Sequence, residues 1–438
     1  MSSIPASHSV GDSGSDASFA ARTYAKVTWR LVPFLFLCYV VAYLDRVNVG
    51  FAKLQMLGDL HLSEAVYGLG AGIFFIGYFL FEVPSNIILH KVGARIWIAR
   101  IMITWGIISG AMMFVTSAEM FYILRFLLGV AEAGFFPGII LYLTYWYPSE
   151  RRGRIVAWFM TAVPLSGVIG GPLSGWALQS FSGVNGWAGW QWMFLIEAVP
   201  SVLVGIATIF WLDDGIRRAR WLSDSEKQLL EAGVARDTGY QQGHSLAGVF
   251  RSGRVWVMSL TYFSFVMGLY GVGFWLPSII KGTGVQGALN IGLLSAVPYA
   301  VAAVCMVLIG RHSDQQRERR WHIAVPGVLG GIGLILSAVY GNNTLLAMSA
   351  LTLGTIGIMT TLPLFWSLPT AVLGGTAAAA GIAMINSLGN LAGFVAPFLI
   401  GWIKDTTHST DIGLYTLGAS LFLGAALALA QPSKLVDR

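Results

Sequence analysis

Long apolar runs separated by short polar connections fill almost the whole chain. A membrane-spanning α-helix needs roughly 20 mostly apolar residues, and runs of this length are far longer than a tilted barrel strand. Because the backbone must form its hydrogen bonds internally in lipid, we predict that each run is a helix. The twelve runs that meet this length are residues 28–50, 65–90, 95–116, 119–147, 154–179, 191–212, 255–280, 288–310, 322–340, 343–366, 371–402 and 410–430.

The longest polar stretch, residues 213–253, lies in the middle of the chain and divides the predicted spans six and six. Within it, Ser223 stands three residues before Glu226, the spacing of a capping box, which predicts a short helix. The pattern therefore predicts an all-α membrane protein with twelve transmembrane helices in two six-helix halves. The expected parts are a disordered cytoplasmic tail (1–24), an N-terminal half (25–212), a cytoplasmic linker with a short helix (213–253), a C-terminal half (254–432) and a second cytoplasmic tail (433–438).

The composition excludes a soluble globular protein. Only 11% of the residues are charged and 55% are hydrophobic, whereas soluble chains carry about 25% charged residues. Both cysteines, Cys38 and Cys305, lie inside apolar runs, and no Cys/His cluster has metal-ligand spacing. We therefore expect no metal centre, no cofactor and no enzymatic activity. The net charge of +6 comes mainly from loop residues, so we expect a lipid bilayer around the chain and no nucleic-acid partner.

Lysines and arginines are unevenly distributed between the two sides of the predicted bundle. Of 27 such residues, Arg46 and Arg125 lie deep inside apolar runs, and Lys53, Lys281 and Lys404 lie in or beside odd-numbered connections. The others lie in or next to the two tails and the even-numbered connections. Because positively charged loops stay in the cytoplasm, we predict that both termini are cytoplasmic.

Ionisable side chains inside the predicted spans are the main candidates for function, because charges are costly in a bilayer. Asp45 and Arg46 lie in the first span, and Arg125 and Glu132 lie in the fourth. Arg125 and Glu132 are seven residues apart, so they lie on one helix face about two turns apart, whereas the adjacent Asp45 and Arg46 point roughly 100° apart. The last six spans carry no such residue in their interiors, so the ionisable side chains that could bind an anion or a proton are concentrated in the N-terminal half.

These four side chains indicate how binding of an anion and binding of a proton could be coupled. Two arginines and two carboxylates nearly neutralise each other in an empty site, which lowers the cost of burial. The planar guanidinium group binds a carboxylate through two hydrogen bonds and never loses its proton, so one arginine can exchange its partner for a substrate carboxylate. The protein carboxylate that loses its counter-charge becomes a candidate proton carrier. The alternative is a static ion-pair cluster that orients the N-terminal half.

Several segments resemble a known family of transporters. Gly310–Arg320 has a glycine, an aspartate four residues later and basic residues after it, which resembles the loop motif of the major facilitator superfamily. The corresponding segment after the second run lacks the aspartate. This departure is similar to the anion:cation symporter branch, and within it to the tartrate-, phthalate- and hydroxyphenylacetate-type carboxylate permeases. The resemblance covers about residues 24–430 and rests on the segments YLDRVNVGFA, EVPSNIILHKVGARIW, RFLLGVAEAGFFPG, YPSERRGR and WQWMFLIEAVPS.

The resemblance implies a role for each charged residue in the spans. Arg46 would be the anchor for the substrate anion, and Asp45 and Glu132 would be the proton carriers. Arg125 would be the partner that adjusts the proton affinity of Glu132, and it would also belong to the substrate-binding set.

The remaining substrate-binding candidates are polar or aromatic. Tyr78 and Asn390 match positions where the family contacts its substrate, although packing between helices explains both equally well. Trp366 and Ser367 lie between two prolines, which loosen a membrane helix and free carbonyl groups for hydrogen bonding. Two further acids are placed outside the substrate site. Glu82 is interpreted as a gate element that pairs with loop arginines, and Glu197 as a structural partner of a basic residue in a cytoplasmic loop or of the backbone.

The leading hypothesis is a secondary active transporter that takes up a small organic carboxylate by symport with protons and alternating access. An exchanger or antiporter without proton coupling is the alternative, and the glycine-rich segment Gly167–Trp176 is compatible with antiport or with close packing. A non-transporting sensor is disfavoured because it needs a larger soluble domain. The resemblance implies a monomer in the inner membrane of a bacterium, with protons as the coupling ion. Tartrate-like, sugar and aromatic acids all remain open as substrates.

Overall fold

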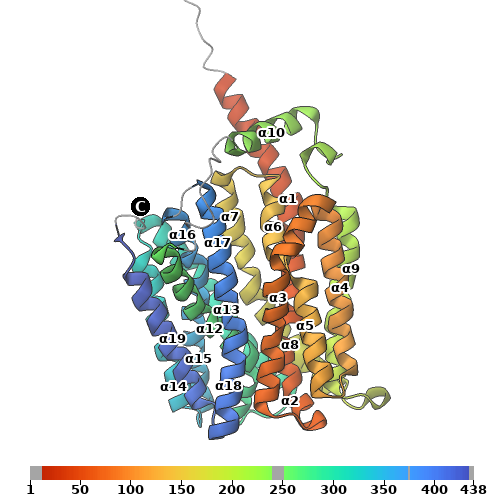
Figure 1. Ribbon diagram of the computed structural model, residues 1–438, viewed down its shortest axis with the longest axis vertical. Coiled ribbons are helices and arrows are strands. Elements are labelled where there is room, and N and C mark those ends of the chain that lie inside the picture. The colour runs from red at the N-terminus through yellow and green to blue at the C-terminus, as the bar shows by residue number, and fades with distance from the viewer. Residues whose placement is uncertain (1–11, 239–250, 373–374, 434–438) are drawn as a thin grey trace, which may run out of the picture.

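The computed structural model describes residues 12–238, 251–372 and 375–433. Within these residues, twelve helical stretches are long and apolar enough to cross a membrane, as predicted. Figure 1 shows them side by side in two groups. The first six spans consist of α1 (Asp12–Val47) with α2 (Val49–Leu60), α3 (Glu64–Val92), α4 (Ala94–Ala111), α5 (Ala118–Glu132) with α6 (Phe135–Thr144), α7 (Ser149–Met160) with α8 (Ala162–Ser180), and α9 (Gly189–Trp211). The last six consist of α12 (Gly253–Gly282), α13 (Ala288–Gln316), α14 (Arg320–Val339), α15 (Thr344–Phe365) with α16 (Ser367–Val372), α17 (Gly375–Asn390) with α18 (Ala392–Thr407), and α19 (Asp411–Leu429).

Several runs predicted as single helices are interrupted along their length. The first changes from α1 to α2 at Asn48, and the eleventh changes from α17 to α18 at Leu391. The fourth is interrupted at Ala133 and Gly134, directly after Glu132, and Gly134 has a φ of +82°. A side chain is strained at such a φ, and a Cβ at Gly134 would also lie 2.5 Å from the Ser85 hydroxyl oxygen. Hydropathy cannot show these interruptions because the residues around them are apolar.

The N-terminal end corrects one sequence prediction. Residues 12–24 were expected to belong to a disordered tail, but they form the first turns of α1. The Tyr24 ring is buried and stacks with Tyr147 at 6.2 Å, and the Arg151 guanidinium carbon lies 4.2 Å from the Tyr24 ring centroid. These contacts hold α1 helical beyond the membrane. Residues 1–11 of the predicted tail and 434–438 of the second tail lie outside the described residues.

The linker contains the short helix that its capping-box pattern predicts. In α10 (Asp224–Thr238), the Ser223 hydroxyl accepts from the Glu226 backbone N–H at 3.3 Å, and the Glu226 carboxylate accepts from the Ser223 N–H at 2.8 Å. The Lys26 ammonium, 2.8 Å from the same carboxylate, holds the pKa of Glu226 below its usual value and joins α10 to α1. Residues 239–250 of the predicted linker are not among the described residues.

The two halves are in close contact at the end of the bundle opposite α10 (Figure 1), which we call the closed end. There α3 packs along α18, and α8 packs along α13. A Cβ on Gly292 of α13 would clash with the Gly171 carbonyl of α8, so these two helices can approach this closely only because both residues are glycine. The closed end therefore brings backbone against backbone across the halves.

An ion-pair cluster also joins the halves at the closed end. The Glu64 carboxylate of α3 lies 2.6 Å from the Lys53 ammonium of α2 and 2.6 Å from the Lys404 ammonium of α18. The Lys53 nitrogen is buried 3.2 Å from the ring centroid of Trp275 in α12. The Asp405 carboxylate of α18 accepts from the backbone N–H groups at the start of α3. Lys53 and Glu64 of one half are thus bound to the other half.

Replacing Glu64 with glutamine should favour opening of the closed end. The substitution removes the negative charge between two ammonium groups, and ion pairs of this kind contribute on the order of 1 kcal/mol each. We expect the ratio of open to closed forms to rise roughly tenfold. Spin labels at Asn185 and Asn342, which are exposed on turns of the two halves, would report longer distances.

Asp59→Asn is a matched control for this experiment. The Asp59 carboxylate accepts from the Trp190 indole N–H at 2.8 Å, and both residues belong to the N-terminal half. Its loss should leave the distance between the labels unchanged. Identical distance distributions for Glu64→Gln and the wild type would show that the ion pairs do not set this equilibrium.

Candidate substrate and proton-coupling site

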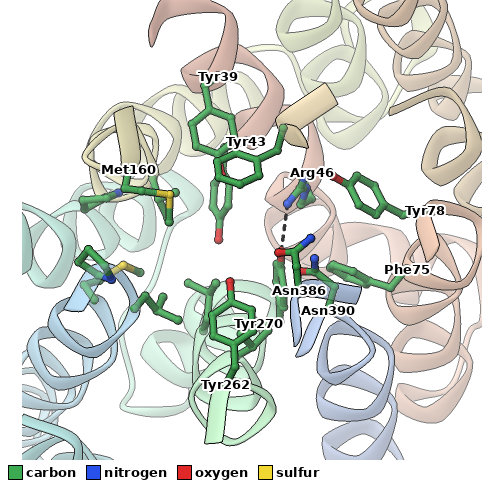
Figure 2. Close-up of a pocket in the computed structure, with 18 of the residues that line it drawn as sticks. Tyr39, Tyr43, Arg46, Phe75, Tyr78, Met160, Tyr262, Tyr270, Asn386 and Asn390 are labelled. Atoms are coloured by element: carbon green, nitrogen blue, oxygen red, sulfur yellow. Dashed lines mark hydrogen bonds between the residues drawn. The ribbon is translucent and has the colours of Figure 1, made fainter. Parts of the chain in front are cut away.

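A cavity lies between the two halves, and both contribute to its walls. Its empty volume, including the part open to solvent, is about 700 Å³. Figure 2 shows Arg46, Tyr78, Asn386 and Asn390 on one side and Met160 on the other. The cavity thus offers a polar, positively charged wall and an apolar wall.

Among the described residues that line this cavity, Arg46 is the only charged one. Its guanidinium group donates to the Glu132 carboxylate through Nε at 3.1 Å and, more closely, through Nη2. Nη1 donates to the Tyr270 hydroxyl of α12 at 3.0 Å, the hydrogen bond drawn in Figure 2. The rings of Tyr43 and Tyr78 have their centroids within 5.6 Å of its guanidinium carbon. The arginine is therefore held in an aromatic surrounding and links the two halves.

Glu132 lies behind Arg46 and does not line the cavity. Only 1% of its surface is exposed, and its position at the last residue of α5 places it beside the helix interruption. The sequence placed Glu132 on one face with Arg125, but its hydrogen-bond partner is Arg46. Arg125 acts on it through its charge alone.

Arg125 was expected in the substrate-binding set, and the structure places it elsewhere. It is fully buried and does not line the cavity. Its guanidinium group donates to the carbonyls of Gly70 at 3.3 Å and Ala71 at 3.1 Å, both in α3. These bonds turn the group towards α3 and away from the space that a substrate would occupy.

Asp45 points away from Arg46, as adjacent helix positions require. Its carboxylate accepts from the Trp105 indole N–H at 2.9 Å, from the Ser109 hydroxyl at 2.9 Å and from the Ser201 hydroxyl. The donors belong to α4 and α9, all three are neutral, and the carboxylate is 1% exposed. Asp45 is thus buried within the N-terminal half, separate from the cavity wall.

Among the candidates from the C-terminal half, Asn390 lines the cavity but Trp366 and Ser367 do not. The Ser367 hydroxyl, at the start of α16, donates to the Leu364 carbonyl at the end of α15 at 2.6 Å. The Trp366 ring packs against Tyr262, with the ring centroids 4.9 Å apart. Trp366 therefore supports a cavity residue and does not face the cavity itself. The prolines flanking the pair explain the loosened helix but not the direction of these side chains.

Three cavity tyrosines were missed by sequence reasoning: Tyr39, Tyr43 and Tyr262. A signal for the first two exists, because Tyr39, Tyr43 and Arg46 follow the spacing of one helix face. Tyr262 likewise lies two turns before Tyr270, which also lines the cavity.

The Glu82 carboxylate has a different partner from the loop arginines that the sequence suggested. It accepts from the Asn386 amide at 3.0 Å and from the Ser387 hydroxyl at 3.3 Å, both in α17 of the other half. Asn386 also lines the cavity. Glu82 therefore joins the halves next to the cavity through neutral donors.

Comparison with known proteins identifies the family. The model for the Major Facilitator Superfamily matches residues 35–397. The chain is 50% identical over 417 residues to the "Putative metabolite transport protein NicT" of Pseudomonas putida, covering 95% of each chain. It is 52% identical over 411 residues to a "Putative tartrate transporter" of Agrobacterium vitis, covering 93% of this chain and 91% of that one.

Solved structures show the same fold at low sequence identity. The inward-open xylose transporter XylE of E. coli superposes with a TM-score of 0.72 at 16% identity, covering 93% of this chain and 96% of that one. These similarities and the twelve spans make the protein a multi-pass membrane transporter. The chain belongs to the major facilitator superfamily, as its sequence motifs predicted.

Proposed function

We propose that this protein takes up a small organic carboxylate together with protons across the bacterial inner membrane. The observation that carries the proposal is the placement of Arg46 in the wall of a cavity shared by both halves, paired with the buried Glu132 carboxylate. The name of the tartrate transporters that this chain resembles supports a carboxylate substrate. The protein works as a monomer, with protons as its coupling ion.

Binding of the anion begins with a change of partner at Arg46. A substrate carboxylate that enters the cavity competes with Glu132 for the guanidinium group, whose planar fork binds carboxylates through two hydrogen bonds. The Asn390 amide and the Tyr270 hydroxyl are available in the same cavity for the rest of the molecule. The polar wall therefore favours an acid with hydroxyl or carbonyl groups near its carboxylate.

Proton coupling follows from the loss of Arg46 as the partner of Glu132 when the anion binds. Once Glu132 has lost Arg46, it is a buried carboxylate without its hydrogen-bonded counter-charge and keeps only the weaker influence of Arg125, and burial of such a group is costly unless it is neutral. Anion binding and proton binding at Glu132 therefore stabilise each other, and this linkage couples the two solutes. Asp45, held by neutral donors, is the second proton carrier.

Alternating access follows from the closed end. The charge distribution of the loops supports a cytoplasmic position of both termini and α10, and in this proposal the closed end faces the outside. Release of the contacts at Glu64 and closure around Glu82 would turn the cavity towards the other side, by rocking of the two halves about the site.

Uptake into liposomes tests this proposal. Purified protein reconstituted with an inward proton gradient should accumulate labelled tartrate, or another acid that stabilises it in a thermal-shift panel of tartrate, galactonate, glucarate, phthalate, nicotinate and hydroxyphenylacetate. A protonophore should abolish accumulation but leave exchange of internal for external acid. Exchange without any accumulation would instead support the exchanger, and a panel without a stabilising acid would refute the carboxylate assignment.

A further inference from the structure

Glu197 is a buried acid that the proposed mechanism does not use. It lies in α9 with 1% of its surface exposed. One carboxylate oxygen, Oε1, accepts from the Ser174 hydroxyl of α8 at 2.6 Å. The other, Oε2, has no hydrogen-bond partner within the described part of the chain. The sequence interpreted Glu197 as the partner of a basic loop residue or of the backbone, yet Ser174 is neither.

Asn48, at the interruption between α1 and α2, faces the same carboxylate. It is 2% exposed, and both its amide oxygen and its amide nitrogen lack a hydrogen-bond partner among the described residues. The Asn48 amide and the Glu197 carboxylate thus face each other in the interior without a hydrogen bond of normal geometry. Native proteins leave few buried polar atoms unpaired, and each such atom points to a strained, chemically active or solvent-binding position.

A second cavity gives this cluster access to the space between the halves. Its empty volume is about 400 Å³, and Asn48 and Ser174 both line it. Tyr43, Ser166 and Ser295 line the same cavity. Gly171, where α8 meets α13 at the closed end, also lines it. The cluster around Glu197 therefore lies beside a partly polar cavity close to the closed end.

On its other side Glu197 lies near Asp45. Ser201, one helical turn after Glu197 on α9, donates to the Asp45 carboxylate, and the two carboxylates act on each other electrostatically. Among the described residues, the groups that act on the Glu197 carboxylate are Asp45 of α1, Ser174 of α8 and Asn48 at the interruption between α1 and α2, and none of these is a cation. Two buried carboxylates without a cation between them are costly to keep charged together, so binding of a proton by either one relieves this cost.

We propose that Glu197, with Asn48 and Ser174, is a further proton-binding site that passes protons between the second cavity and Asp45. The inference rests on the proposed proton coupling. When the closed end opens, water in the cavity delivers a proton to the Glu197 carboxylate. The proton moves on to the Asp45 carboxylate, and Glu197 is protonated again from the cavity. No other bond is made or broken. Glu197 thus supplies the outside route for protons, separate from the route of the anion past Arg46.

Glu197→Gln tests the site, because glutamine keeps the shape and the acceptor for Ser174 but cannot carry a proton. In liposomes we expect exchange of the acid within about twofold of the wild type, and proton-driven accumulation lowered at least tenfold, as for the loss of roughly 1.4 kcal/mol of driving force. Glu197→Asp should restore part of the accumulation. Glu119→Gln, the same change at an exposed residue of α5, should behave as the wild type.

Other outcomes of this experiment would overturn the site. Full accumulation by Glu197→Gln would show that the residue carries no proton. Equal loss of exchange and accumulation, in a variant that still binds the acid in the thermal-shift assay, would assign it a structural role. A strict requirement for Na⁺ that Glu197→Gln removes would assign the site to a metal cation.

Infrared difference spectra keep the site testable if the wild type does not accumulate the acid, an outcome that would refute the proposed function. On raising the pH, the purified wild type should lose the C=O bands of its buried carboxylic acids, Asp45 and Glu132 included, and the part of this loss that belongs to Glu197 should be missing in Glu197→Gln. Identical difference spectra for the two proteins would contradict proton binding at Glu197.

Discussion

Replacing Arg46 with glutamine should lower the affinity for the acid on the order of 100-fold, about 3 kcal/mol, which is typical for loss of one partner in a buried, hydrogen-bonded charge pair. Arg46 donates to Glu132 and to Tyr270 of the opposite half. The substitution therefore removes the anion anchor and leaves Glu132 buried without its counter-charge. It should also lower the free energy of unfolding by about 3–5 kcal/mol for the same reason. Acid-dependent thermal stabilisation of the purified protein measures both effects.

The double variant Arg46→Gln with Glu132→Gln separates loss of the anchor from loss of stability. Both members of the pair become neutral amides, so the thermal stability should recover most of its wild-type value, while the acid should still fail to bind. Recovery of binding in the double variant, or full binding by Arg46→Gln alone, would contradict the role of Arg46 as the anchor. Arg125→Gln is a less suitable control, because it leaves the carbonyls of Gly70 and Ala71 without their donor.

The twelve spans could be predicted because their signal is local. Each run is apolar over enough residues to cross the bilayer, and the long polar stretch before Gly253 marks the boundary between the halves. The interruptions at Asn48 and after Glu132 could not be found this way. They depend on how neighbouring helices pack against the backbone at the interruption, for example on the limited space at Gly134. Hydropathy does not contain this information.

The candidate site was predictable to the level of the helix but less so to the level of the side chain. Helical periodicity correctly separated Asp45 from Arg46, because adjacent residues must point in different directions. It also placed Arg125 near Glu132, but the rotation of α5 against α3 directs Arg125 to the carbonyls of Gly70 and Ala71. Contacts between the halves, such as Arg46 with Tyr270, depend on tertiary packing that a single sequence does not contain.

The two halves contribute different kinds of side chain to the candidate site. The charged pair Arg46 and Glu132 and the buried Asp45 belong to the N-terminal half, whereas Tyr270, Asn386 and Asn390 of the C-terminal half offer neutral groups. These neutral groups contact Arg46 and Glu82 across the halves without adding a further charge to the site. This arrangement suits halves that must separate and meet again in each transport cycle.

Asp45→Asn should leave binding and exchange of the acid intact and abolish its proton-driven accumulation. Asp45 does not line the cavity, and the hydroxyls of Ser109 and Ser201 can reverse to accept from an asparagine amide. With one proton per acid, a pH gradient of one unit drives roughly tenfold accumulation, and we expect the variant to stay near equal concentrations on both sides. Uptake and exchange in liposomes, measured on the same preparation, check this result.

Glu132→Gln should differ from Asp45→Asn in one respect. Both lose accumulation, but Glu132→Gln also frees Arg46 from its competitor, so the acid should bind more tightly, by roughly tenfold if the competing pair is worth about 1.4 kcal/mol. An unchanged or weaker affinity would show that Glu132 does not compete with the substrate for Arg46. Full accumulation in both variants would show that neither residue carries the coupled proton. Opposite effects on affinity and on accumulation would place the anion and the proton at neighbouring but distinct groups, with Arg46 as the residue that couples them.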